Sequence, residues 1–119
     1  MQDIDEALAQ ILANTGIGRF ELVGFDACLM GQLEVFDAVS PHARYAVASE
    51  ETEPALGWAY ADFLTGLNNN AGWTGWELGQ AIVQSYVDQD RRITDAGARR
   101  GLASDMGLGS DPGAQVMAS

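Results

Sequence analysis

The spacing of hydrophobic and polar positions predicts an alternation of helices and strands. In segment 3–14, Ile4, Leu8 and Ile11 recur at helical spacing and predict an amphipathic helix. Residues 20–25 are short, mostly apolar and rich in β-forming side chains, so they predict a buried strand. Residues 30–39 predict a second helix, which ends before Pro41 because proline cannot continue a helix. Residues 43–49 predict a second strand.

The order strand, helix, strand predicts a βαβ unit with two parallel strands. Further along, residues 59–67 predict a short helix, residues 68–72 a loop, and residues 74–88 a longer helix with Thr74 as its N-cap. The fold class is therefore α/β. Because two parallel strands are too few for a stable sheet, we expect further strands in the complete sheet.

Composition and charge narrow the class of protein. The chain has 119 residues, of which 47% are hydrophobic and 19% charged, as in a globular domain or a piece of one. Seventeen acids and six bases give a net charge of −11, which argues against nucleic-acid binding and would attract a cationic substrate or partner. No apolar run is long enough to predict a membrane span, and the first ten residues do not resemble a signal peptide.

The two ends of the chain differ in composition. Fourteen of the acids and every aromatic residue lie within residues 1–90, which predict the packed part of the chain. Residues 91–119 contain four arginines, five glycines and no aromatic residue, which predicts a weakly structured tail. One cysteine and one histidine exclude an intrachain disulfide and argue against a zinc site within the chain.

Asp26 and Cys28 follow the first predicted strand directly and precede the next predicted helix. Ligands of open α/β sheets bind beyond the carboxyl ends of the strands, and a helix N-terminus favours the thiolate, so this position suits a nucleophilic cysteine. A lone cysteine also often packs as a small buried residue. Asp26 either caps the helix that follows or lies in a pocket that selects a cation.

Other polar residues separate into the two ends of the predicted sheet. His42 follows the helix and is expected to be a surface histidine at the end far from Cys28, too distant to act as its base. Residues 49–54, SEETEP, follow the second strand and form either an acidic rim beside Asp26 or a solvated loop. Trp58 and Tyr60 line a pocket or cover the core, whereas Trp73 and Trp76 are expected to be packing residues.

Two segments of the chain together resemble a known family. Residues 25–30, FDACLM, are similar to the nucleophile segment of clostripain-like cysteine peptidases, peptidase family C11. Residues 47–54, VASEETEP, followed by Gly57, Trp58 and Tyr60, resemble the next block of that family. The blocks have the same order and a compatible spacing, and the resemblance covers roughly residues 5–88.

The resemblance implies a caspase-like (clan CD) three-layer fold with a mainly parallel sheet, present here only as a fragment: residues 1–90 as the nucleophile half and residues 91–119 as a tail outside the family. It implies that Cys28 is the nucleophile of a His/Cys dyad, and that Asp26 binds arginine or lysine at P1 in the S1 pocket. Thr52 would lie in the loop that borders this pocket. Calcium is associated with some relatives, although no ligand cluster or other cofactor is identified in the sequence, and relatives are commonly exported or cell-envelope bacterial enzymes.

One feature departs from the family pattern. The family histidine precedes the cysteine and follows the preceding strand, whereas none of the first 27 residues here is a histidine. The chain is therefore expected to be an internal fragment that is inactive without the remainder of the peptidase domain. The alternative is a non-catalytic module that binds basic peptides through Asp26 and the acidic loop.

Overall fold

The computed structural model describes residues 2–53, 57–88 and 95–105 of the chain. Its elements occur in the order α1 (Gln2–Thr15), β1 (Phe20–Phe25), α2 (Leu33–Val39), β2 (Ala43–Ala48), α3 (Tyr60–Asn69), α4 (Gly75–Asp88) and α5 (Ala96–Asp105). Strands β1 and β2 form a parallel two-stranded sheet in which Phe20 is paired with Ala43 and Phe25 with Ala48. The α/β class and the parallel βαβ unit are confirmed.

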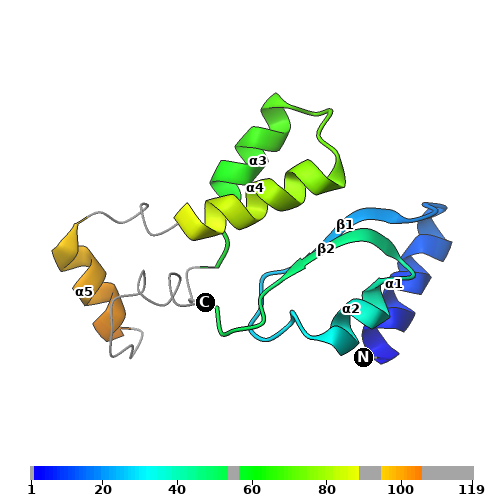
Figure 1. The fold of residues 1–119 in the computed structure, drawn as a ribbon, viewed down its shortest axis with the longest axis horizontal. Helices are drawn as coiled ribbons and strands as arrows, with labels where there is room; N and C mark the ends of the chain where they lie inside the picture. The colour runs from blue at the N-terminus through cyan, green and yellow to red at the C-terminus, as the bar shows by residue number, and fades with distance from the viewer. Residues whose placement is uncertain (1, 54–56, 89–94, 106–119) are drawn as a thin grey trace.

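Helices cover both faces of this sheet, as Figure 1 shows. On one face, α1 and α2 pack through Ile4, Leu8, Val35 and Val39 against the sheet. On the other face, α3, α4 and Trp58 form a second apolar cluster. Because successive side chains of a strand point to opposite faces, neighbouring residues of β1 serve different clusters. Residues 2–53, 57–88 and 95–105 contain no helix that is long and apolar enough to cross a membrane.

Close packing of α4 on the sheet depends on two glycines. A Cβ on Gly75 would lie 2.6 Å from the carbonyl oxygen of Glu21, and one on Gly79 would lie 3.2 Å from Leu22. The predicted N-cap of this helix is confirmed as a reciprocal pair. The N–H of Thr74 donates to the Glu77 carboxylate across 2.7 Å, and the N–H of Glu77 donates to the Thr74 hydroxyl across 3.3 Å. The backbone N–H of Thr74, followed by its hydroxyl, donates to the Glu77 carboxylate and lowers the pKa of this group.

Several predicted boundaries are wrong. Helix α2 begins at residue 33 instead of residue 30, and α3 continues through Asn69, which was expected in a loop. Trp76, predicted as a packing residue, contacts Tyr45 of β2 but remains 56% exposed. Of the predicted tail, residues 95–105 include α5, and the rest lies outside the described residues.

His42 lies where the sequence placed it along the sheet, but it is not a surface residue. It is 9% exposed, and its Nε2 lies 2.6 Å from an Asp5 carboxylate oxygen of α1. Its carbonyl oxygen accepts the N–H of Phe20 at the start of β1. His42 therefore joins α1 to the amino end of the sheet, the end opposite the loop that contains Cys28.

Candidate active site

Cys28 lies in the loop between β1 and α2, at the carboxyl end of the sheet. The side chain is exposed, and its Sγ accepts the backbone N–H of Glu53 across 3.2 Å. The sequence placed this cysteine next to a helix N-terminus, but α2 begins five residues later. Contact with the loop after β2 positions the thiol instead. The alternative of a buried, packed cysteine is wrong.

The residues after Cys28 are held against the loop that follows β2. The N–H of Leu29 donates to the carbonyl oxygen of Glu51 across 3.1 Å, and the N–H of Gly31 donates to that of Ser49 across 2.7 Å. Leu29 has a φ of 60°, in the left-handed region that side chains other than glycine rarely adopt. A backbone in this region costs about 1–3 kcal/mol and needs surrounding contacts to persist. Backbone hydrogen bonds therefore hold residues 29–31, which follow Cys28, against residues 49–51.

Gly31 is required by the same contact. An added Cβ would lie 2.7 Å from the backbone nitrogen of Glu50 and from the carbonyl carbon of Ser49. Only glycine allows the two loop backbones to approach so closely. Because residues 29–31 are used in this way, they are not available for the helix that the apolar spacing predicted.

Asp26 does not cap α2, because the N-cap position of that helix is Gln32 and it has no side-chain cap. Its Oδ2 accepts the backbone N–H of Trp58 across 3.1 Å and the hydroxyl of Tyr60 across 3.0 Å. The interpretation of Asp26 as a helix cap is therefore wrong, and its role in a cation-selecting pocket stays a prediction. Gly57 has a φ of 62°, and an added Cβ would lie 2.8 Å from this carboxylate oxygen, so the turn before Trp58 also fits closely around Asp26.

Glu53 approaches Asp26 from the opposite loop. Its Oε1 accepts the indole N–H of Trp58 across 3.1 Å. Burial raises the pKa of Glu53 to about 7, and the neighbouring Asp26 carboxylate contributes to the increase. The pKa of the Tyr60 hydroxyl is also raised, mainly by burial and then by its hydrogen bond to Asp26. The carboxyl groups of Asp26 and Glu53 thus lie together with the aromatic side chains of two residues, Trp58 and Tyr60.

The acidic rim is confirmed in part. Glu53 belongs to it, Glu50 and Glu51 are exposed in the loop, and Thr52 is exposed between Glu51 and Glu53. A hollow of about 480 Å³ adjoins this loop and is lined by Glu51, Glu53 and Trp58 on one side and by α4 on the other. This hollow provides room for a peptide side chain beside the rim.

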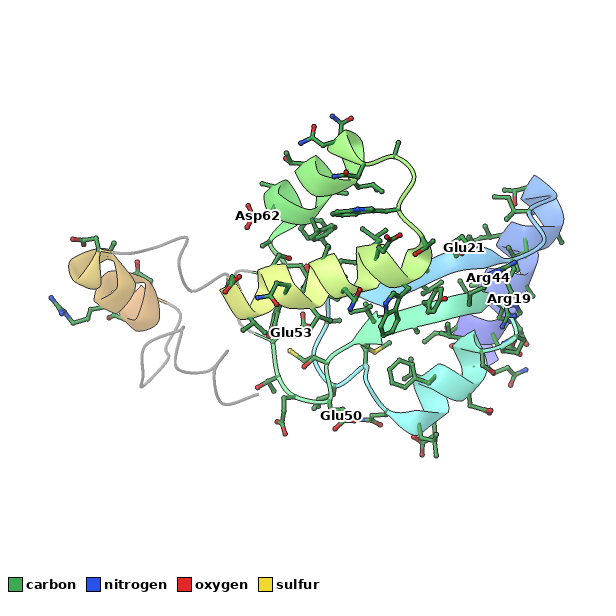
Figure 2. The ribbon with its side chains drawn as sticks, turned by 45° about the horizontal axis from the view of Figure 1, so that its top comes forward. Arg19, Glu21, Arg44, Glu50, Glu53 and Asp62 are labelled. Carbon is green, nitrogen blue, oxygen red and sulfur yellow. The ribbon has the colours of Figure 1, made fainter. Side chains whose placement is uncertain are left out.

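Charge is segregated along the sheet. Figure 2 shows Glu50 and Glu53 beyond the carboxyl end of β2, whereas Arg19, Glu21 and Arg44 lie at the opposite end. Arg19 donates to the carbonyl oxygen of Ser40 across 2.6 Å, and Arg44 lies 3.1 Å from the Glu21 carboxylate. Both arginines within residues 1–90 are therefore paired far from the acidic end. A cation that neutralises this end must come from outside residues 1–90.

Comparison with known proteins assigns the family. Residues 1–101 match the family model described as the clostripain family. The chain belongs to the clostripain family. Membership indicates that the chain is part of a cysteine peptidase and that its substrates are proteins or peptides. No curated protein and no solved structure matches the chain.

The sequence did not identify the partners of the Asp26 carboxylate. Trp58 and Tyr60 were candidate pocket residues, but neither was expected to donate a hydrogen bond to a carboxylate more than 30 positions away. The local sequence signal for this arrangement is Gly57, because glycine readily adopts the positive φ of the turn that precedes Trp58. Within residues 2–53, 57–88 and 95–105, no three His, Cys, Asp or Glu side chains are grouped in a way that could hold a metal ion.

Proposed function

We propose that this chain is the nucleophile-bearing part of a clostripain-like endopeptidase that cleaves after arginine or lysine. The Cys28 thiolate attacks the scissile carbonyl carbon, the peptide C–N bond breaks, and a thioester acyl-enzyme forms that water then hydrolyses. One observation carries the proposal. Glu53 contacts the thiol through its backbone and reaches, through Trp58, the carboxylate of Asp26.

Asp26 is proposed as the residue that pairs with the basic P1 side chain. Its carboxylate is oriented by Trp58 and Tyr60, and the arginines of residues 1–90 lie at the other end of the sheet. A guanidinium or ammonium group that enters here meets negative charge, and no arginine of residues 2–53 and 57–88 competes for it. Thr52, exposed in the adjoining loop, is proposed to border the same pocket.

The general base is proposed to come from a strand that precedes α1 in the complete domain. His42 is not suitable, because it lies at the amino end of the sheet and pairs with Asp5. Helices α1 and α2 cover the same face of the sheet. Connections between parallel strands are almost always right-handed. Two successive helices on the same face of a sheet therefore mean that each new strand is added on the same side of the strand before it. A strand before α1 would then pair with the free edge of β1 and end beside Cys28, which is also the arrangement of the proposed caspase-like fold.

A second function is worth testing because the carboxyl groups of Asp26 and Glu53 both bind Trp58, whereas His42 lies at the other end of the sheet. The chain would then bind basic peptides through Asp26 and the acidic loop without cleaving them. Alkylation of Cys28 by iodoacetamide as a function of pH separates the two functions. A thiol that titrates near the free value of about 8.5 favours the binding module, and a lower value favours a preserved nucleophile.

An affinity label tests the peptidase proposal directly. An arginyl chloromethyl ketone is expected to alkylate Cys28 roughly tenfold faster than a norleucyl analogue, a ratio that corresponds to about 1.4 kcal/mol. Asp26→Asn should remove this preference when each ketone rate is divided by the iodoacetamide rate of the same variant, and Cys28→Ala should abolish labelling. Equal rates for the two ketones would contradict the basic P1 specificity.

Catalytic turnover by the 119-residue chain is expected to be very low. Loss of a general base typically costs about 10²- to 10⁴-fold in rate. A clear arginine-specific amidase activity of the purified chain, lost in Cys28→Ala, would show that no upstream base is needed.

A further inference from the structure

Glu53 connects the two halves of the candidate site. Its backbone N–H donates to the Sγ of Cys28, and its side chain accepts the indole N–H of Trp58. The same tryptophan donates its backbone N–H to Asp26. One aromatic residue therefore holds two carboxyl groups, one through its ring nitrogen and one through its backbone. These contacts fix the position of Glu53 in the acidic loop.

The second carboxyl oxygen of Glu53 distinguishes it from its neighbours. Glu50 and Glu51 are exposed, whereas Oε2 of Glu53 is buried, and no donor within residues 2–53, 57–88 and 95–105 reaches it. A buried carboxylate oxygen without a donor is costly, because it loses hydration and gains nothing in return. The cost disappears if the oxygen carries a proton or if a cation approaches it.

The surroundings of Glu53 favour the proton in the empty site. Burial is the main cause that raises its pKa to about 7, followed by the Asp26 side chain, which accepts a hydrogen bond from the protonated form and repels the ionised form. The hydrogen bond that the Trp58 indole donates to Glu53 has the opposite effect and lowers the pKa. The titratable groups around Glu53 come from every neighbouring segment: Asp26 and Cys28 after β1, Glu50 and Glu51 after β2, Tyr60 of α3 and Tyr86 of α4.

We propose that Glu53 is a second carboxyl of the cation pocket, protonated when the pocket is empty and ionised when a basic P1 side chain binds beside Asp26. The proton passes to solvent. This inference rests on the proposed function, which assigns the pocket at Asp26 to arginine or lysine. Its consequence is that the bound cation meets two negative charges, whereas the empty pocket carries one.

Coupling between cation and proton follows from linkage. A ligand that favours the ionised form of Glu53 lowers the pKa of this group and must release a proton near neutral pH. The affinity for a cation therefore rises as the pH increases through about 7, the pKa of Glu53 in the empty pocket. If Glu53 only positions Trp58, its protonation is unaffected by the cation and no proton is released.

Isothermal titration of the 119-residue chain with benzamidine measures this proton. The titration is performed at pH 7 in phosphate and in MOPS, and at pH 9 in borate and in CHES. The two buffers of each pair differ in heat of ionisation, so the difference in observed heat gives the number of protons released. We expect a fraction of one proton to be released at pH 7 and almost none at pH 9. Neutral benzamide, which has the same shape, should not bind, and Asp26→Asn should abolish benzamidine binding.

Glu53→Gln is the decisive variant, since the amide resembles the protonated carboxyl in size. Proton release should disappear, and affinity at pH 8 should fall by roughly threefold to tenfold, the range of a partly exposed ion pair. Binding by the wild-type chain without proton release at pH 7 overturns this inference and leaves the basic specificity intact. Persistent release in Glu53→Gln also overturns it. A complete absence of benzamidine binding overturns both proposals.

Near-UV circular dichroism shows whether the variant keeps the packing of its tryptophans. If Glu53→Gln does not fold, the pH dependence of benzamidine binding by the wild-type chain still tests the inference. Benzamidine affinity that increases with pH, with a midpoint near the empty-pocket pKa of about 7, supports the inference, and affinity independent of pH from 6 to 9 overturns it.

Discussion

The backbone N–H of Glu53 donates to the Sγ of Cys28 across 3.2 Å, between residues 25 positions apart. This contact joins the two loops at the carboxyl end of the parallel strands. It places Cys28, the proposed nucleophile, beside the residue whose side chain shares Trp58 with Asp26. Changes that disturb either loop should therefore affect both thiol reactivity and cation recognition.

Gly57→Ala should damage the pocket. The residue has a φ of 62°, and a Cβ would lie 2.8 Å from Oδ2 of Asp26. We expect a loss of about 1–3 kcal/mol in the free energy of unfolding and loss of the preference for the arginyl ketone. Urea denaturation and labelling rates measure both. Gly72→Ala is the matched control, since its Cβ would meet no atom within 4 Å. Wild-type behaviour of Gly57→Ala would show that the turn is not fitted to Asp26.

Gly31→Ala should separate the two loops. Its Cβ would lie 2.7 Å from backbone atoms of residues 49 and 50, which cannot move as a flexible side chain can. Overpacking of this kind costs about 1–3 kcal/mol. We expect lower stability in urea and a changed alkylation rate of Cys28. Gly18→Ala, with open space around its Cβ, serves as the control. If the two variants behave alike, the close loop contact is not present in solution.

Stability should decrease as pH rises through the range in which Glu53 titrates. Its pKa is raised from 4.5 to about 7 in the folded chain, so folding favours the protonated form. This stabilisation is complete below about pH 4.5 and is lost as the pH approaches 7. Glu53→Gln should therefore match the wild-type chain near pH 4 and exceed it in unfolding free energy at pH 8. A constant difference across this range would contradict the raised pKa.

His42→Gln should leave the chemistry of Cys28 unchanged. The imidazole pairs with Asp5 at the other end of the sheet, so we expect iodoacetamide rates within twofold of wild type. Loss of this partly buried hydrogen bond should lower the unfolding free energy by about 1 kcal/mol. Asp5→Asn, which disturbs the same pair while keeping the histidine, is the comparison. A tenfold slower alkylation in His42→Gln alone would indicate that His42 does act on the thiol.

Thr74→Ala should weaken the start of α4. The hydroxyl and the Glu77 side chain form a reciprocal cap, and loss of an N-cap typically costs about 1 kcal/mol. Thermal unfolding measures the difference. Thr65→Ala, at an exposed position of α3, should change stability by less. Equal effects of the two substitutions would mean that the cap contributes nothing.

Apolar spacing predicted β1 with its observed bounds because Phe20–Phe25 is a strand in which local propensity and burial agree. The same reasoning began α2 three residues too early. Residues 29–31 carry the apolar pattern of a helix, but their backbone is paired with residues 49–51. That pairing depends on segments distant in the chain, and no local pattern reports it.

The sequence by itself determined the α/β class, the parallel βαβ unit and the position of Cys28 and Asp26 beyond the strand ends, because hydrophobic periodicity and the geometry of parallel strands require them. It also supported the family resemblance. Only the tertiary structure decided that Asp26 binds Trp58 and Tyr60 instead of capping a helix, that His42 is buried against Asp5, and that the backbone of Glu53 contacts the thiol of Cys28. Each of these contacts links residues more than 20 positions apart, so their partners are set by how the elements pack.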